Sequence, residues 1–312
     1  VAYSYVSTPF AWSFEQCKVG SHAAGTANAL TGRPEWPAWI ERKRIDDALT
    51  AEAYEKAGPT CRAAIKTATA MFMRYDAPAR EVVHEERTDP SSGFWRSRTV
   101  FPAPWAVVAF TPEYTAAARL LGAVMPAIIT GVPLIAAVCV GGIPSEPLLT
   151  ALDLAGIEDI FSLSDVELSA LLEETQPGPG RLVLLHTGRL DTLRLQARGL
   201  HVPVFEERRA PTITIPRPEL FNLDVLRFAQ GDAPVDEALE SPAPDAPDVL
   251  YAAPEAVRRH CLARARSQFS LGMAPLALTP GCEGFWLHHG LGRSFFLSHR
   301  VGFGLDLDGQ QN

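Results

Sequence analysis

Two short segments carry residue types that bind phosphate or move protons. Residues 111–114 read Thr-Pro-Glu-Tyr and residues 186–189 read His-Thr-Gly-Arg, and each follows a short apolar run. Backbone N–H groups at the start of a helix bind anions, and an arginine adds a fork of donors for phosphate. We therefore predict a cofactor site, the alternative being ordinary strand-to-helix turns with a solvated arginine. The predicted cofactor-binding residues are Thr111, Pro112, Thr187, Gly188 and Arg189.

Three residues are candidates for catalysis. Glu113 could act as an acid or base, although the helix dipole alone also favours a glutamate in a first helical turn. Glu206 belongs to a Glu-Glu-Arg-Arg run, and it would be a general base if buried but otherwise part of a solvated loop that pairs its own charges. Cys282 is the one candidate nucleophile, and the alternative is a partly buried free thiol.

The C-terminal tail also holds side chains that can bind metals. Two of its histidines are adjacent, so their rings point in different directions on a helix or a strand. The tail has neither a pair of histidines four residues apart nor a Cys-x-x-Cys motif. We therefore predict no metal site and no zinc. The donors considered are Cys282, Glu283, His288, His289 and His299.

The elements that must position these residues alternate between strand and helix. Apolar runs predict strands at 105–110, 134–140, 160–163, 182–185, 202–205 and 212–215. Helical stretches are predicted at 114–129, 147–154, 165–173, 189–197 and 220–229. This spacing is typical of βαβ units and predicts an α/β fold with a mostly parallel, Rossmann-like sheet covered on both faces. Segment 111–114 then lies at a strand's carboxyl end, where open α/β sheets bind ligands.

The sequence divides into three regions. Residues 1–100 comprise an irregular segment, an N-terminal helical arm at 39–74 and a polar, turn-rich stretch at 80–100. Residues 101–235 form the predicted nucleotide-binding domain. Residues 236–312 contain a proline-rich linker, a basic helix at 255–266 and an aromatic tail.

Composition and charge narrow the classes of function. With 312 residues and 47% apolar content, the chain has ample material for a packed core. A formal net charge of −8 without a basic stripe argues against nucleic-acid binding. Five widely spaced cysteines and the lack of an opening secretory signal favour a cytoplasmic location. The apolar stretch 120–140 is interrupted by Pro126, Gly131 and Pro133, so we predict no membrane span.

Several short motifs occur in the alternating region, at Pro126-Ala127, Thr130-Gly131-Val132 and Ala155-Gly156-Ile157 followed by Ile160. Together with the helical arm, they resemble the nucleotide-binding part shared by histidinol dehydrogenases and aldehyde dehydrogenases. The resemblance implies NAD or NADP as the cofactor and an alcohol or aldehyde as the substrate.

The motifs that carry these families' chemistry are replaced. Aldehyde dehydrogenases have Thr-Pro-Trp-Asn where this chain has Thr-Pro-Glu-Tyr at 111–114, and their cysteine turn falls near 230–232, where no cysteine stands. The histidinol dehydrogenase zinc run Gln-Ala-Glu-His falls on Phe228-Ala229-Gln230-Gly231. We therefore predict an NAD(P)-dependent, oxidoreductase-like protein with degenerate catalytic residues. The alternatives are a non-catalytic ligand-binding or assembly protein that keeps the fold, and an acyl-group reductase that uses Cys282.

The aromatic tail predicts self-association. Residues 285–303 contain nine large apolar residues and follow the linker, outside the alternating region. Monomers seldom expose apolar patches larger than a few hundred Å², so this segment must be covered. We predict a homodimer built with the tail, which binds a dinucleotide or another small molecule. The alternative is a tail that folds back on its own sheet.

Overall fold

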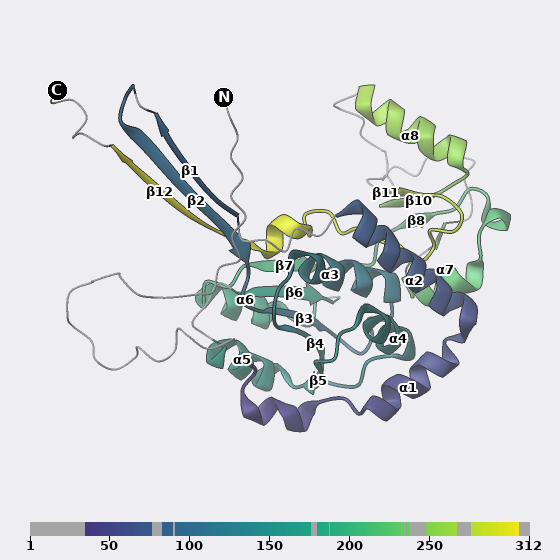
Figure 1. Ribbon diagram of the computed structural model, residues 1–312. Helices are drawn as coiled ribbons and strands as arrows, with labels where there is room; N and C mark the ends of the chain where they lie inside the picture. Colours follow the sequence, from purple (N-terminus) through teal and green to yellow (C-terminus); the bar gives the residue numbers. More distant parts are fainter. Residues whose placement is uncertain are drawn as a thin grey trace, which may run out of the picture. The chain divides into compact units, whose positions relative to one another are not determined.

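Two parallel sheets and one antiparallel sheet organise the chain (Figure 1). The computed structural model describes residues 35–76, 83–89, 91–175, 180–186, 188–231, 233, 235–236, 248–266 and 276–305. All of these belong to one unit, which spans residues 34–312. The predicted α/β class is confirmed.

The main sheet has five strands, all parallel, in the order β5-β4-β3-β6-β7. From β3 the chain proceeds outward through β4 to β5 and then returns to the other side of β3 to form β6. The strand order therefore reverses between β3 and β6. The strands are β3 (Ala106–Phe110), β4 (Ile135–Val140), β5 (Ile160–Leu163), β6 (Arg181–Leu185) and β7 (Val204–Glu207).

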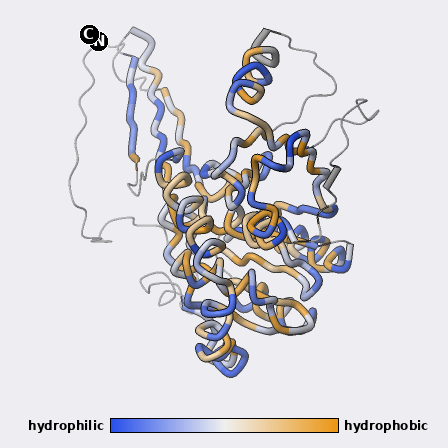
Figure 2. Tube along the Cα trace, turned by 90° about the vertical axis from the view of Figure 1, so that its right-hand side faces the viewer, coloured by the Kyte–Doolittle hydropathy of each residue, from blue (hydrophilic) through white to orange (hydrophobic). Residues whose placement is uncertain are grey.

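Helices cover both faces of this sheet. Strand β3 shows why: Val108 and Phe110 belong to one core cluster, whereas Val107 and Ala109 belong to another. Successive strand side chains point to opposite faces, so a strand buried on both sides reads as an uninterrupted apolar run. Figure 2 shows hydrophobic and hydrophilic residues alternating along the helices, as expected for helices with one face on a core. Helices α3 (Ala117–Thr130) and α4 (Glu146–Ala155) line the first cluster, and α5 (Asp165–Glu174) and α6 (Asp191–Gly199) the second.

The predicted N-terminal helical arm is present and is broken before Gly58. A 3-10 helix, η1 (Ala38–Lys43), precedes α1 (Asp47–Lys56) and α2 (Gly58–Tyr75). Gly58 has a φ of +69°, a backbone conformation that glycine adopts without strain. The buried side chains of α2, Ile65, Ala68 and Phe72, join the first core cluster.

Residues 80–100 differ from the prediction of a polar, turn-rich stretch. Most of them form a hairpin of β1 (Val83–Asp89) and β2 (Phe94–Pro102). The polar composition concealed the strands, because β1 is largely exposed and the middle of β2 consists of Arg, Ser and Thr. Strand β12 (Leu297–Leu305) pairs antiparallel with β2 and completes a three-stranded sheet.

A second parallel sheet has the order β11-β10-β8-β9. The predicted strands near 202–205 and 212–215 therefore belong to different sheets. The strands of the second sheet are β8 (Ile213–Thr214), β9 (Val235–Asp236), β10 (Val249–Tyr251) and β11 (Leu276–Leu278). The remaining helices are η2 (Pro218–Leu220), α7 (Leu223–Gln230), α8 (Pro254–Arg266) and η3 (Arg293–Phe296).

The tail does not stay outside the alternating core, and that expectation is wrong for its first part. Phe285, Trp286 and Phe296 are buried in the core cluster that contains α3. Gly122 makes this possible, because a Cβ there would lie 2.8 Å from the backbone oxygen of Trp286. Arg181 also ties the tail to the sheet, since its guanidinium donates to the backbone oxygens of Phe295 and Leu297.

The apolar stretch 120–140 is divided between helix α3 and strand β4. Across the described ranges, no helix combines the length and the apolar character that crossing a bilayer requires.

Candidate functional site

The two predicted cofactor segments meet at one edge of the main sheet. Strands β3 and β6 are neighbours, with Phe110 opposite Leu185, and segments 111–114 and 186–189 follow directly at their carboxyl ends. The side chains of Glu113 and Arg189 form an ion pair between the two segments. This edge is the point where the strand order reverses, and ligands of open α/β sheets bind at such switch points.

A cavity of about 190 Å³ opens at this edge. It is lined by residues at or just after the carboxyl ends of four neighbouring strands: Thr111, Val140, Gly141, Ser164, Asp165, Arg189 and Leu190. Among the predicted cofactor residues, Thr111 and Arg189 line the cavity directly. Pro112 lies against Gly142, where an added Cβ would be 2.5 Å from the proline ring. Thr187 lies outside the described residues.

Two charged residues line the cavity, Asp165 and Arg189, and Glu113 lies beside it as the ion-pair partner of Arg189. The pKa of Glu113 is lowered first by its backbone N–H, then by the Thr111 hydroxyl, with a smaller effect from Arg189. Glu113 is therefore ionised at neutral pH and holds Arg189. Asp165 begins helix α5, whose N-cap Ser164 forms a capping box with Glu167. Asp165 thus lines the cavity at the start of a helix whose Glu167 N–H already donates to Ser164.

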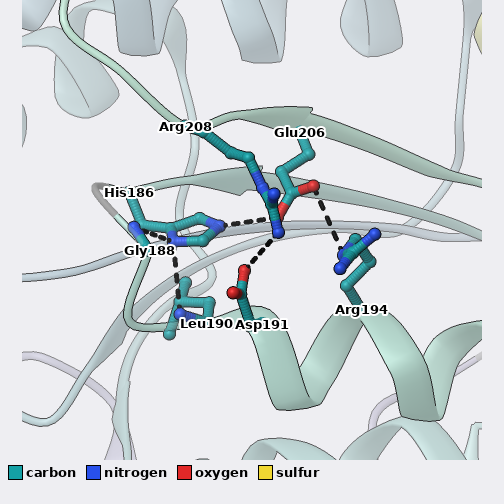
Figure 3. Close-up of polar contacts among 7 residues, drawn as sticks. All are labelled: His186, Gly188, Leu190, Asp191, Arg194, Glu206 and Arg208. Carbon is teal, nitrogen blue, oxygen red and sulfur yellow. Dashed lines mark hydrogen bonds and ion pairs between the residues drawn. The ribbon is translucent and has the colours of Figure 1, made fainter.

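In segment 186–189, a backbone N–H group donates to the His186 side chain of the same segment. His186 is buried, and its Nδ1 accepts hydrogen bonds from the backbone nitrogens of Gly188 at 2.8 Å and Leu190 at 3.2 Å (Figure 3). Its Nε2 lies 3.1 Å from Oε1 of Glu206, so the geometry assigns the proton of the neutral ring to Nε2. The N–H of Gly188, predicted to bind an anion, is therefore already engaged.

His186, Asp191 and Glu206 place possible metal-binding atoms within 4.8 Å of one another. Two arginines enter the same cluster, as Figure 3 shows. The Arg208 guanidinium lies 2.6 Å from Asp191 and 3.0 Å from Glu206, and the Arg194 side chain lies 3.4 Å from the other Glu206 oxygen. These cations supply the charge that a metal ion would bring, so the cluster is an ion-pair network. The expected absence of a metal site stays a prediction.

The four residues that fall on the zinc-binding run of histidinol dehydrogenases, 228–231, do not suit zinc. Phe228 and Gly231 offer no ligand atom, and the Gln230 amide donates to the Tyr251 hydroxyl at 2.9 Å. Zinc sites need three or four N, O or S donors in a fixed geometry. Residues 228–231 therefore do not form a zinc site.

Glu207 lies in a buried polar network that sequence reasoning missed. Residues 206 and 207 belong to β7 and not to a solvated loop. The Glu207 carboxylate accepts from the Arg119 guanidinium and from the Tyr114 hydroxyl at 3.2 Å, and it lies 3.0 Å from Nδ1 of His288. Burial opposes ionisation, but His288 and then Arg119 outweigh it and lower the pKa of Glu207 to about 2. The one sign of this network in the sequence is Arg119, a charged residue within the apolar run 117–129 that needs a buried acidic partner.

None of the cysteines that the structure describes lines the cavity. Cys282 is half-buried, with its Sγ 3.6 Å from the Thr279 hydroxyl, and it is not among the described residues that line the cavity. Cys139 is buried within β4, and burial raises its pKa to about 12. Neither thiol has the exposed, electropositive surroundings of a reactive cysteine.

No protein-family model and no curated protein sequence matches the chain. Among solved structures, histidinol dehydrogenase from Elizabethkingia anophelis is similar with a TM-score of 0.52 at 12% identity, over 86% of this chain and 78% of that chain. An aldehyde dehydrogenase from Brucella melitensis biovar abortus 2308 has a TM-score of 0.35 at 18% identity, over 75% of this chain and 51% of its own. Lactaldehyde dehydrogenase from Escherichia coli has a TM-score of 0.33 at 15% identity, over 73% of this chain and 54% of that chain.

At identities of 12–18% the similarity concerns the fold alone, and of the three structures only the histidinol dehydrogenase has a TM-score above 0.5. The predicted resemblance is thus confirmed at the level of the fold. The chain has a fold distantly related to that of histidinol dehydrogenase.

Proposed function

We propose that this chain binds the nucleotide of NAD or NADP at the switch point between β3 and β6, as an oxidoreductase-like protein with degenerate catalytic residues. The observation that carries the proposal is the meeting of segments 111–114 and 186–189 around one cavity at this edge. Dinucleotides bind at this position in sheets of this order.

The cavity fits one end of such a cofactor. Whole small-molecule sites measure roughly 300–1,000 Å³, whereas this cavity measures about 190 Å³, which suits a nucleoside with the remainder lying across the open strand ends. Asp165 would accept hydrogen bonds from ribose hydroxyls, and Arg189 would pair with phosphate after leaving Glu113. The nicotinamide ring supplies hydride transfer when it is bound.

A second candidate function is ligand binding without catalysis, and the lining of the cavity favours it. The described lining residues include no cysteine and no histidine. The nearby His186 engages both ring nitrogens in the turn and with Glu206, and Glu113 is held by Arg189. An acyl-group reductase that uses Cys282 receives less support, because this thiol does not line the cavity.

Calorimetric titration with NAD and with NADP tests the proposal. The two partners of one ion pair supply matched variants: Arg189→Glu should weaken binding by about 1–3 kcal/mol, or roughly 5- to 150-fold. Glu113→Gln should strengthen binding, because it releases Arg189 toward phosphate. Binding of neither cofactor, or equal affinities in both variants, would refute the proposed site. If NAD binds but is not reduced in the presence of alcohols or aldehydes, the second candidate is favoured.

A further inference from the structure

Two neighbouring glutamates of β7 each lie against a buried histidine, and the two contacts differ. The ring of His186 accepts hydrogen bonds at Nδ1 from two backbone N–H groups of its own turn, and its Nε2 faces a Glu206 oxygen at 3.1 Å (Figure 3). One ring nitrogen therefore meets donors and the other meets an acceptor. A neutral imidazole, which has one N–H and one lone pair, satisfies both.

His288 meets acceptors at both of its ring nitrogens. Its Nε2 lies 2.7 Å from the backbone oxygen of Arg119 in α3, and its Nδ1 lies 3.0 Å from Oε2 of Glu207. A carbonyl oxygen cannot donate, so Nε2 carries a hydrogen. A second hydrogen is needed between Nδ1 and the carboxylate, because two lone pairs at this distance repel each other. The pair of His288 and Glu207 therefore holds one proton more than a neutral imidazole and an ionised carboxylate.

This extra proton lies on the ring and is shielded from water. Burial opposes ionisation of Glu207, but His288 and then Arg119 outweigh it and lower the pKa of that carboxyl to about 2. The Tyr114 hydroxyl donates to the same carboxylate at 3.2 Å. Among the described residues, these are the charged and titratable groups that face the ring. Its other neighbours are two aromatic rings with centroids 5.5 and 6.1 Å away, those of Phe205 and Trp286. Because 2% of the His288 side chain is exposed, water cannot take the place of either partner.

We propose that the tail docks on the main sheet together with a proton taken from solvent, which makes His288 doubly protonated, and that it detaches when this proton is lost. His288 belongs to the tail segment that carries Phe285, Trp286 and Phe296 into the core. When the segment detaches, the ring enters water, where an ordinary imidazole is neutral above about pH 6.5. Above this pH the docked form thus binds more protons than the detached form. Its stability is fully present below about pH 6.5 and falls as the pH rises, by at most about tenfold in the docking equilibrium per pH unit.

Nitrogen NMR of the full chain, labelled with ¹⁵N-histidine, tests the protonation directly. The chain has eight histidines, and ordinary histidine rings are neutral at pH 8. One ring with two protonated nitrogens should nevertheless be present at this pH, and His288→Gln should remove its signals. The wild-type spectrum is decisive even where the variant does not fold. If all eight rings are neutral at pH 8, the proposal is wrong.

Hydrogen exchange of the tail measures the detachment itself. His288→Gln and His289→Gln are matched variants, because they place the same non-titrating side chain at adjacent positions, one buried and one exposed. After correction for the intrinsic pH dependence of exchange, the open fraction of residues 285–296 should rise about five- to tenfold from pH 7 to pH 8 in wild type and in His289→Gln. In His288→Gln it should not change with pH. Equal pH dependence in the two variants, or none in wild type, would overturn the proposal.

Discussion

Replacing Glu207 by glutamine tests the buried network that ties the candidate site to the tail. The carboxylate is 13% exposed and lies between the Arg119 guanidinium and the His288 ring. The amide keeps the shape of the side chain but removes the negative charge. The buried Arg119 guanidinium then faces a neutral group, and breaking a buried ion pair costs about 3–5 kcal/mol.

The pKa of Glu207 leads to the same magnitude. Its pKa is about 2 in the folded chain against an ordinary value of 4.5, a difference that corresponds to roughly 3 kcal/mol of stability. Because the folded pKa is the lower one, this stability is fully present above pH 4.5 and is lost as the pH falls toward 2. At pH 7, Glu207→Gln should lower the melting temperature by about 6–12 °C, since each kcal/mol shifts it by about 2–4 °C.

Urea unfolding at pH 7 and at pH 3 measures both effects. The free energy of unfolding should differ between wild type and Glu207→Gln at pH 7, and this difference should shrink to less than half at pH 3. Glu219→Gln is the control, because Glu219 forms an exposed ion pair with Arg217 whose removal should leave stability unchanged. Equal stability of wild type and Glu207→Gln at pH 7, or a difference that does not change with pH, would refute the reasoning.

Two further predictions concern a buried cysteine of the core and the close contact between Gly231 and Thr115. Cys139 should resist thiol reagents at pH 8 in the folded chain while the exposed Cys261 reacts, because burial raises the pKa of Cys139 to about 12; mass spectrometry of labelled peptides checks this, and native-state labelling of Cys139 would contradict it. Gly231→Ala should destabilise the chain by about 1–3 kcal/mol in thermal unfolding, because its Cβ would lie 2.3 Å from the Thr115 hydroxyl and φ is +58°. Gly281→Ala, which combines a φ of +89° with open space, separates backbone strain from this clash, and an equal loss in both would remove the clash from the explanation.

Local patterns in the sequence predict most of the main sheet and its helices. The runs at 105–110 and 182–185 are uninterrupted and apolar because both faces of a central parallel strand are covered. The ends of the predicted helices shift by a few residues, as α7 shows by beginning at Leu223 and not near residue 220. The hairpin at 83–102 was missed because β1 is exposed and the middle of β2 is polar, so neither strand shows an apolar run.

The meeting of segments 111–114 and 186–189 could also be expected from the sequence, because both follow strands of one parallel sheet. The hydrogen bonds that each segment makes there could not be predicted from the sequence. The Gly188 N–H, expected to bind an anion, is used by His186, and this depends on how the turn closes around a buried ring.

Contacts between distant parts of the chain were decided by the tertiary structure alone. Glu206 and Glu207 are neighbours in sequence, but strand alternation sends one to Arg194 and Arg208 and the other to Arg119 and His288. Strand β12 joins β2 across some two hundred residues of chain, and nothing local to either segment specifies its partner. The sequence by itself determined the α/β class, because periodicity records burial residue by residue. The tertiary structure decided which charges and which edges meet, because these pairings depend on complementary groups far apart along the chain.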